Sequence, residues 1–379
     1  METYDAIVIG GGIAGVSLAY ELQSDRRVGL LEMEMHLAFH TTGRSAATFL
    51  ETYGGPQIRA LTTGSRAFFE NPTAPVEHSP LRPLGLVWIA TEPNVRAIEG
   101  MYAEMHPLVP EVRVLTAAEA VQINPVLKQD HLALALFEPG AMEIDVHLLH
   151  QGFVRGFSDH GGVVRTAARV TGAVRSEDFE TDHVWTLIDS GGNKYRAPLV
   201  VNAAGSWVDV VAAMFGARSI GIAPLRRTIF MVPSPQGSRT AELPMAADVE
   251  NTFYIKPDGE QYLCSPADEV LRSPSDPRPD ELRIAQAMEA IDAATHLAPR
   301  HVRSSWAGLR NFAPDRIPVV GFDPRLDGFF WFAGQGGYGI QTAPAMARLA
   351  AALVRGQAPP ADLVARGLDV GRLTPARFG

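Results

Sequence analysis

The sequence predicts a two-domain α/β (α+β two-domain) protein, in which a doubly wound nucleotide-binding domain is joined to a domain built on an antiparallel β-sheet. Three observations predict this. The chain has 379 residues, too many for one simple core. A glycine-rich turn stands between an apolar strand and a helical pattern near the N-terminus. Further along, the runs LGLVWIA, RRTIFMV, TFYIKP and EQYLCS are typical of strands.

The composition is that of an ordinary globular protein, with 46% hydrophobic and 20% charged residues. The net charge of −9 argues against a nucleic-acid binder, which needs a basic face. Only three of the 33 lysine and arginine residues are lysines. This bias favours the forked, bidentate recognition of carboxylate or phosphate that arginine provides.

The single cysteine, Cys264, excludes an internal disulfide and a cysteine-based metal cluster. It stands in a strand-like run, so we expect a buried, inert thiol. No group of His, Cys and carboxylate residues has ligand spacing, and we expect no metal. The apolar N-terminal run lacks the basic leader of a signal peptide, and no stretch reaches the roughly 20 apolar residues of a membrane span. We therefore expect a cytoplasmic protein.

The glycine motif G-x-G-x-x-G, formed by Gly10, Gly12 and Gly15, follows a strand at Ala6–Ile9 and opens a helix. In a Rossmann-like domain these glycines allow a tight turn, close approach of a pyrophosphate and helix–strand packing. The helix N-terminus attracts the phosphates. Glu32 ends the next strand, where a carboxylate binds ribose hydroxyls and repels a 2′-phosphate, which disfavours NADP. The alternative is a glycine turn that merely starts a helix.

The loop after Glu32 contains H-TTGRSAA in place of a prompt third strand. It resembles the FAD-contacting segment of the D-amino acid oxidase-like flavoproteins, which include glycine and sarcosine oxidases and D-amino acid dehydrogenases. Three further segments resemble segments of the same family and follow in the same order along the chain. They begin EIDVHLLHQGF, APLVVNAAGSW and WAGLRNFAPDR, and the third continues into FFWFAGQGGYGIQT. The resemblance therefore covers essentially the whole chain. The closest likeness is to the FAD-dependent D-arginine dehydrogenases, in the runs GRSAA, TGSRAFFENP, HQGFVRG, VNAAGSW, RRT, FYIKPD, WAGLR and QGGYGIQT.

The resemblance implies a Rossmann-like domain that binds FAD noncovalently, assembled from residues 1–80, 145–220 and 308–379. The discontinuous substrate-binding (cap) domain would comprise 81–144 and 221–307, with its antiparallel sheet covering the flavin. The FAD contacts that the family pattern implies are Gly10, Gly12, Ile13, Ala14, Gly15, Glu32, Met33, Thr41, Thr42, Gly43, Arg44, Ser45, Ala46, Ala47, Thr48, Arg169, Ala204, Gly205, Trp207, Gly308, Gly336, Gly337, Tyr338, Gly339 and Ile340.

The resemblance also implies that two arginines grip an amino-acid carboxylate while its Cα lies against the flavin. These positions are Arg227, from the sheet, and Arg310, in WAGLR, and the two would converge from opposite domains. Tyr53 and Tyr254 match tyrosines that close the pocket, and Gly337 belongs to the glycine loop at the flavin edge. Ordinary surface ion pairs and core tyrosines bonded to backbone are the alternatives.

The run IAPLRRTIF raises the question of which arginine points inward. Strand alternation places Arg227 with Ile229 on one face and Arg226 with Thr228 on the other, and cannot choose between them. The family resemblance selects Arg227 as the inward residue. Arg226 is then expected to be an outer or structural charge.

The implied reaction is hydride transfer from Cα to FAD, giving an imino acid that hydrolyses to a 2-oxo acid and ammonia. The chain departs from the arginine dehydrogenases at three positions. Gly85 lies near the expected carboxylate, and Thr48 and Phe49 replace a histidine and a tyrosine. We therefore expect a preference for neutral or apolar D-amino acids, with Glu51 as the one residue that could restore affinity for a cation.

Two further departures concern the cofactor chemistry. No cysteine stands near WAGLR to tether FAD, and His40 occupies a place where some dimethylglycine dehydrogenase-like relatives attach it; we expect noncovalent FAD. The oxygen-activating lysine of sarcosine oxidases is absent from EQYLCSP, so a quinone or other carrier is the expected electron acceptor. The alternatives are a glycine- or sarcosine-type amine oxidase, a 2-hydroxy acid dehydrogenase and a non-catalytic flavin sensor.

Overall fold

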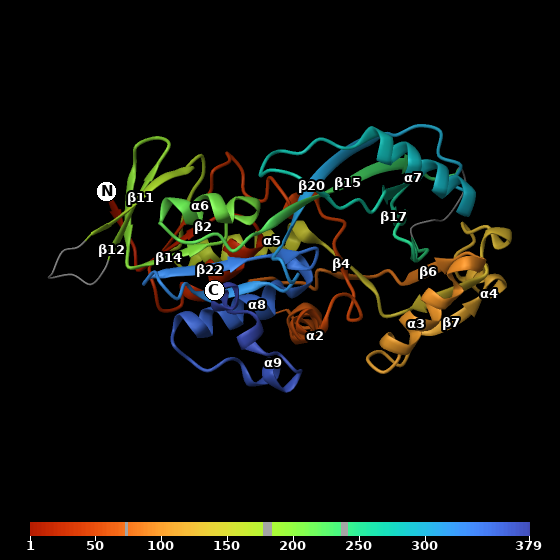
Figure 1. Ribbon diagram of the computed structural model, residues 1–379, viewed down its shortest axis with the longest axis horizontal. Coiled ribbons are helices and arrows are strands. Elements are labelled where there is room, and N and C mark those ends of the chain that lie inside the picture. Colours follow the sequence, from red (N-terminus) through yellow and green to blue (C-terminus); the bar gives the residue numbers. More distant parts are fainter. Residues whose placement is uncertain (73–74, 177–183, 236–241) are drawn as a thin grey trace.

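The computed structural model describes residues 1–72, 75–176, 184–235 and 242–379. The molecule is elongated, with the N-terminus near one end (Figure 1). A parallel sheet occupies its middle and a larger mixed sheet extends toward the other end. The mixed α/β architecture matches the predicted fold class.

The central sheet has six strands in the described chain, in the order β10-β3-β2-β14-β22-β21. All neighbours are parallel except the edge strand β21, which is antiparallel to β22. β2 and β14 are buried along their whole length, as parallel strands covered on both faces should be. The strands are β2 (Ala6–Ile9), β3 (Val28–Leu31), β10 (Val163–Arg165), β14 (Leu199–Asn202), β21 (Val319–Phe322) and β22 (Phe329–Ala333).

Helices cover one face of this sheet, where α1 (Ile13–Leu22), α5 (Val146–Asp159) and α8 (Gly339–Val354) share one apolar core. α2 (Pro56–Glu70) packs outside α8, and the short α9 (Ala361–Ala365) packs on α2. Asp145 caps α5 as expected, its side chain accepting the Leu148 N–H at 2.8 Å. Figure 1 shows α2, α8 and α9 below β22.

The opposite face of the central sheet carries α6 (Val208–Met214) and a four-stranded sheet, which share a second apolar core. Figure 1 shows α6 and α8 on opposite sides of β22. In the part of the chain that the structure describes, the smaller sheet has the order β1-β13-β12-β11. Its strands are β1 (Glu2–Thr3), β11 (Val170–Ser176), β12 (Val184–Asp189) and β13 (Lys194–Ala197).

The large sheet contains ten strands among the described residues, in the order β23-β20-β15-β18-β17-β16-β6-β8-β7, with β19 paired to β15. It is antiparallel except at the β16–β6 pair, which is parallel. The strands are β6 (Leu86–Ala90), β7 (Arg113–Thr116), β8 (Leu134–Glu138), β15 (Ala223–Pro233), β16 (Met245–Asp248), β17 (Tyr254–Asp258), β18 (Gln261–Ser265), β19 (Val270–Leu271), β20 (Ser304–Phe312) and β23 (Gln335–Gly336).

One face of the large sheet is covered by α7 (Glu281–Ala294), whose Ile284 and Ile291 pack with Phe230 and Cys264 of the sheet. Cys264 is fully buried there, and burial raises the pKa of its thiol, as expected for an inert cysteine. α3 (Val95–Met105) and α4 (Ala117–Ile123) pack at the β7–β8 end. The other face of the sheet looks toward the central sheet.

A short sheet, in the order β4-β9-β5, lies between the two larger ones; its strands are β4 (Thr48–Phe49), β5 (Leu81–Pro83) and β9 (Met142–Ile144). No helix in the described ranges is both long and apolar enough to cross a membrane. The expected domain boundary at 308 falls inside β20, which belongs entirely to the large sheet. The large sheet therefore draws strands from both expected domains.

Candidate active site

A cavity of about 510 Å³ lies between the central sheet and the open face of the large sheet. From the central sheet it is bordered by Ile9, Leu31 and Ala203, at the carboxyl ends of β2, β3 and β14. From the large sheet it is bordered by side chains of β6, β15, β16 and β17. The carboxyl ends of parallel strands are where α/β sheets bind ligands.

The close approach of β2 and α1 requires glycine at two positions, Gly10 in the turn and Gly15 in the helix. Gly10 has φ +112°, and a Cβ there would lie 2.4 Å from the Ala203 carbonyl oxygen. A Cβ on Gly15 would lie 1.8 Å from the Gly10 carbonyl oxygen, so Gly15 sets the close packing of helix on strand and does not line the cavity. α1 therefore begins at the cavity wall, with the positive end of its dipole toward it.

Glu32 is held in place at the end of β3. It is 8% exposed, and its two carboxylate oxygens accept the N–H groups of Gly11 at 2.7 Å and of Glu34 at 2.9 Å. Its side chain lines the cavity together with Met33 and Arg169. A carboxylate fixed in this way offers its free lone pairs to the hydroxyls of a ribose.

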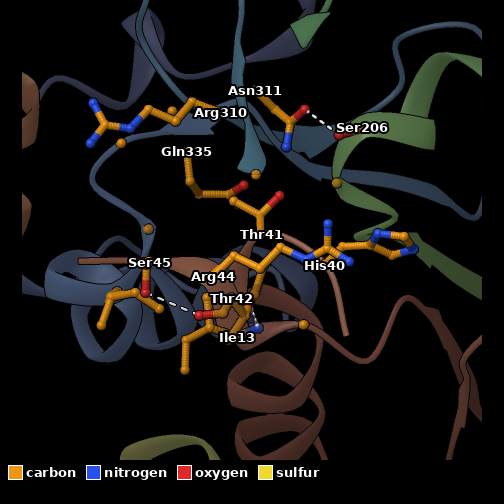
Figure 2. Close-up of a pocket in the computed structure, with 18 of the residues that line it drawn as sticks. Ile13, His40, Thr41, Thr42, Arg44, Ser45, Ser206, Arg310, Asn311 and Gln335 are labelled. Atoms are coloured by element: carbon orange, nitrogen blue, oxygen red, sulfur yellow. Dashed lines mark hydrogen bonds between the residues drawn. The ribbon is translucent and has the colours of Figure 1, made fainter. Parts of the chain in front are cut away.

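Residues of the loop 38–48 line the cavity, and the loop is hydrogen-bonded both to the start of α1 and to β20 (Figure 2). Thr42 accepts the Ile13 N–H at 3.0 Å, and Thr41 donates to the Leu309 carbonyl at 2.7 Å. The Arg44 guanidinium donates to the Ala307 carbonyl at 3.0 Å and pairs with Asp276 at 2.5 Å. Arg44 thus anchors the loop to β20 and to the segment 273–280.

Arg227 and Arg310 lie on the same face of the large sheet, in neighbouring antiparallel strands. Arg227 of β15 stands directly opposite Gly308 of β20, and Arg310 follows two residues later. Since alternate residues share a face, both guanidinium groups line the cavity. The expectation that they converge from opposite domains was wrong, because β20 is part of the large sheet.

Arg226 points to the other face of the sheet and is fully paired. Its guanidinium contacts Asp268 at 3.1 Å and Asp280, the N-cap of α7, at 2.5 Å, and its side chain is 6% exposed. This arrangement agrees with the structural role expected for Arg226. The two adjacent arginines of β15 therefore have opposite surroundings.

The cavity has an excess of positive charge around Arg227. Burial, and then the neighbouring Arg310, lowers the pKa of Arg227. Its one carboxylate partner in the described chain is Glu269, at 3.3 Å. Glu269 also forms a bidentate pair with Arg316, with both distances 3.1 Å. The Arg227 Nε is buried with no partner among the described residues. Because Glu269 is shared with Arg316, the two neighbouring guanidiniums have less negative charge beside them than positive, and a further anion would be favourable there.

Two tyrosines stand beside the arginines. The Tyr53 hydroxyl accepts a hydrogen bond from Arg310 at 3.4 Å, and its ring packs on Tyr338 with centroids 4.8 Å apart. Tyr338 itself lies behind the cavity wall. The Tyr254 hydroxyl is buried and has no partner in the described part of the chain. Both tyrosines line the cavity, and the unpaired hydroxyl is available to a bound molecule.

Several apolar side chains line the cavity near the arginines. Leu86 and Trp88 of β6 project into it, together with Ile229, Met245 and Leu50. Their positions follow from strand alternation, since residues 86 and 88 share a face. The sequence analysis did not predict these residues, although the alternation in LGLVWIA carried the signal.

The comparisons with known proteins identify the family. The family model "DAO: FAD dependent oxidoreductase" matches residues 5–353. The chain belongs to this family. FAD is accordingly the cofactor.

Individual relatives are distant. The chain is 26% identical to the glycine oxidase of Geobacillus kaustophilus (strain HTA426), over 95% of each chain. It is 26% identical to the mitochondrial dimethylglycine dehydrogenase of Homo sapiens, covering 99% of this chain and 44% of that protein. Among solved structures, L-proline dehydrogenase from P. horikoshii superposes with a TM-score of 0.81 at 19% identity, over 100% of this chain and 98% of that one. The expected closeness to D-arginine dehydrogenases stays a proposal.

The cavity wall fits FAD in its donor groups. The glycine turn and the start of α1 suit a pyrophosphate. Glu32 suits a ribose, and Arg169 lines the cavity as well. At the other end, α8 begins at Gly339 after the glycine loop, so its free N–H groups and positive dipole end lie at the cavity. Figure 2 shows Arg310 and Gln335 on one side of the cavity and Ser206 and His40 on the other.

Most residues that the resemblance selected for FAD line the cavity. The exceptions are Gly15, Gly43 and Tyr338. A Cβ on Gly43 would lie 2.4 Å from the Ala38 carbonyl oxygen, so this glycine serves the shape of the loop. The members that line the wall are Gly10, Gly12, Ile13, Ala14, Glu32, Met33, Thr41, Thr42, Arg44, Ser45, Ala46, Ala47, Thr48, Arg169, Ala204, Gly205, Trp207, Gly308, Gly336, Gly337, Gly339 and Ile340. Their contact with FAD stays a prediction.

Of the four positions on which the expected substrate preference rests, only Thr48 lines the cavity. Gly85 does not line the cavity, and a Cβ there would face Phe137 and Pro244, both at 3.2 Å. Glu51 forms an ion pair with Arg66 at 2.8 Å and is not in the cavity wall. Phe49 is fully buried in the core, whereas Thr48 lines the cavity. Glu51 is thus already neutralised by its own cation.

Proposed function

We propose that this protein is an FAD-dependent dehydrogenase that oxidatively deaminates amino acids with neutral or apolar side chains, with a preference for the D configuration. The single observation that carries the proposal is the paired arginine site, Arg227 and Arg310, facing an apolar wall in the FAD cavity. The D configuration rests on the resemblance in residues such as RRT, WAGLR and QGGYGIQT.

Substrate binding is proposed to begin with the carboxylate. Arginine guanidiniums form bidentate, charge-assisted hydrogen bonds with carboxylates, and two of them fix both the position and the direction of the group. The carboxylate would also add negative charge beside the two guanidiniums, of which Arg227 has only the shared Glu269 among the described residues. Tyr53, already bonded to Arg310, and the unpaired Tyr254 hydroxyl lie where they can complete the hydrogen bonds.

FAD, when bound, supplies the hydride acceptor for the Cα–H bond. The protein's contribution is orientation: with the carboxylate gripped, the Cα–H bond can take only a small range of directions, and this positioning is a large part of the rate. The enclosing side chains exclude water from the reacting atoms. The imino acid product then hydrolyses to the 2-oxo acid and ammonia.

The side-chain preference is argued from the wall formed by Leu86, Trp88, Ile229 and Met245. An apolar substrate side chain buried against it gains about 0.8 kcal/mol per CH₂. A cationic side chain would lose its hydration there and, among the described lining residues beyond Glu32 at the nucleotide end, would meet no carboxylate. Glycine would leave this apolar wall without a partner.

The test is anaerobic reduction of the flavin by D-Leu, D-Met, D-Phe, D-Arg and their L forms. The loss of flavin absorbance measures the rate of reduction. Rapid bleaching by the apolar D-amino acids and slow bleaching by D-Arg is the expected result. Faster reduction by D-Arg would overturn the side-chain preference, and faster reduction by the L forms would overturn the proposed stereochemistry.

The second candidate is a glycine- or sarcosine-type amine oxidase, favoured by the named relatives glycine oxidase and dimethylglycine dehydrogenase. Glycine, sarcosine and dimethylglycine therefore belong in the same screen, and preferential bleaching by them would select this function. A 2-hydroxy acid such as D-lactate tests the hydroxy acid alternative. A flavin that none of these compounds reduces would point to a sensor.

The electron acceptor is proposed to be a quinone or another carrier. The run EQYLCSP lacks the lysine expected of the sarcosine oxidase branch, and β17 carries the nearest lysine, Lys256, paired with Glu143 and with the Ala46 carbonyl. Turnover should be fast with a soluble quinone and slow with air alone. Rapid peroxide formation with oxygen as the only acceptor would contradict this.

A further inference from the structure

We infer that Glu138, a buried carboxyl group outside the cavity wall, is a positioning residue that acts through Thr52 on Tyr53 and so on the carboxylate site. The inference rests on the proposed function, because Tyr53 and Arg310 are taken to bind substrate. It adds a residue to which neither the sequence motifs nor the cavity wall gives a role.

The position of Glu138 is unusual for a glutamate. It is 2% exposed, at the end of β8, and contacts no cation in the described part of the chain. Its partner is the Thr52 hydroxyl, which donates to a carboxylate oxygen at 2.7 Å. In register it stands opposite Leu86, so its side chain lies on the sheet face that looks toward the cavity.

Glu138 holds one end of a short segment that carries Tyr53. At the other end, the Leu50 N–H donates to the Gln341 side-chain oxygen at 3.2 Å, and the Gln341 amide donates back to the Leu50 carbonyl at 3.4 Å. The segment 50–54 is therefore held through Leu50 and Thr52, in addition to the ion pair between Glu51 and Arg66. Tyr53, next to Thr52, places its hydroxyl against Arg310.

The strength of the contact at Thr52 depends on the charge of Glu138. Burial, and to a lesser degree the nearby Glu51, raises the pKa of Glu138 to about 7. A hydrogen bond to an ionised carboxylate is stronger than one to a neutral carboxyl group. Ionisation of Glu138 near neutral pH therefore strengthens its hydrogen bond with the Thr52 hydroxyl.

The groups that face Glu138 are either apolar or already paired, so we assign the titration near pH 7 to Glu138 itself. From the segment 50–54 come Thr52 and Glu51, and Glu51 is already paired with Arg66 of α2. From β6 comes the apolar Leu86. From β7, Arg113 pairs in register with Phe137 and stacks on its ring, on the opposite face of the sheet.

The experiment uses the FAD-loaded protein and 4-methylpentanoate, an apolar carboxylate without an amino group, and follows binding by the change in flavin absorbance. This probe titrates at about pH 4, like a glutamate side chain, so it stays ionised near neutrality. Its Kd is measured from about pH 6 to about pH 8, on either side of the Glu138 pKa of about 7. KM and kcat for D-Leu are measured in parallel.

We expect Thr52→Val to raise Kd and KM about 10-fold while kcat changes less than about 3-fold, because a displaced Tyr53 weakens binding more than the chemical step. Thr52→Ser, which keeps the hydroxyl, should restore wild-type values. The matched control is Thr63→Val: among the described residues, the Thr63 hydroxyl donates only to carbonyls within α2. For the wild type we expect Kd to fall as the pH rises through about 7. Glu138→Gln keeps an acceptor but cannot ionise, so this fall should be absent from it.

Two results would overturn the inference: wild-type affinity in Thr52→Val, or an unchanged pH dependence of Kd in Glu138→Gln. The second remains decisive even if Thr52→Val fails to fold. Failure of the proposed function looks different, since the wild-type protein would then neither bind 4-methylpentanoate nor be reduced by D-Leu, and the inference would fall with it.

Discussion

Gly337 lies directly against the guanidinium of Arg310: a Cβ at position 337 would be 3.0 Å from both Cζ and Nη1 of the arginine. The glycine loop before α8 and the carboxylate site are therefore fitted to each other. The backbone at Gly337 does not adopt a positive φ, so an alanine is compatible with the chain and only the contact with Arg310 opposes it. The glycine thus leaves space for a side chain of the site.

Replacing Gly337 with alanine should displace Arg310 and raise KM for the amino acid about 10- to 100-fold, since misplacing a binding group by about 1 Å can cost about 100-fold. Steady-state kinetics with D-Leu and the FAD content of the purified protein measure the effect. Gly100→Ala is the control, because a Cβ there meets nothing within 4 Å. An unchanged KM would mean that Arg310 does not hold the substrate.

Replacing Arg227 with alanine should abolish tight carboxylate binding and leave FAD bound. Losing one partner of a buried charge pair costs about 2–5 kcal/mol, which corresponds to at least about 30-fold in affinity. Titration of the holoprotein with 4-methylpentanoate reports the loss. Since burial and the nearby Arg310 already lower the pKa of Arg227, its removal also relieves repulsion, and we expect no large loss of stability. Loss of FAD would place Arg227 in the cofactor site instead.

The neighbouring Arg226 should behave in the opposite way. Arg226→Ala leaves Asp268, which is 2% exposed in its side chain, without its cation, and we expect unfolding to become easier by about 3–5 kcal/mol. Thermal unfolding of the holoprotein measures this. At a temperature where the variant is folded, KM should stay within about 3-fold of the wild type, since Arg226 faces α7 and not the cavity. A large KM effect with normal stability would exchange the roles assigned to the two residues.

Local patterns in the sequence predicted the parts of the site that depend on neighbouring residues. The turn from Ala6–Ile9 into α1 and the N-cap Asp145 follow from residues that are close together in the chain. The carboxylate of Glu32 follows from the spacing of one short motif, whose Gly11 it binds across 21 residues. Strand alternation also separated Arg227 from Arg226 correctly, although only the family resemblance selected the inward one. These features are set by backbone geometry, which short-range sequence records.

Features that depend on long-range pairing could not be predicted in this way. Arg227 and Arg310 are neighbours because β15 and β20 pair across some eighty residues of chain, and no local pattern contains that register. The contact between Thr52 and Glu138 spans 86 residues. From the sequence, Glu51 is an additional acid in the loop before Tyr53 that could bind a cation. Its partner Arg66 lies on the following helix, and no local pattern predicts that ion pair.

Glu138 should also make the stability of the protein depend on pH. Its folded pKa of about 7 lies above the model value of 4.5, so the folded state binds the proton more tightly than the unfolded chain does. The stabilisation is complete below about pH 4.5 and is lost as the pH rises through about 7. The loss approaches about 3 kcal/mol at about 1.4 kcal/mol per pKa unit.

Glu138→Gln removes this dependence, so its free energy of unfolding should gain on the wild type as the pH is raised from about 5 to about 8. Urea unfolding of the two holoproteins at both pH values measures the gain, with Glu104→Gln as a control for an exposed glutamate. A gap between variant and wild type that is the same at both pH values would show that Glu138 is already ionised at the lower pH.

His40 bears on how the flavin is retained. Its ring lies in the cavity wall beside Trp207, with centroids 4.7 Å apart, and its Nε2 is 2.8 Å from a carboxylate oxygen of Glu34. Glu34 thus forms a hydrogen bond with Nε2 of the ring, and this contact fixes the position of the imidazole. We expect noncovalent FAD, so acid precipitation should give a colourless pellet and a yellow supernatant. His40→Ala should then change FAD affinity without changing this outcome. Yellow colour that stays with the precipitated wild-type protein, and leaves it in His40→Ala, would instead identify His40 as the point of attachment.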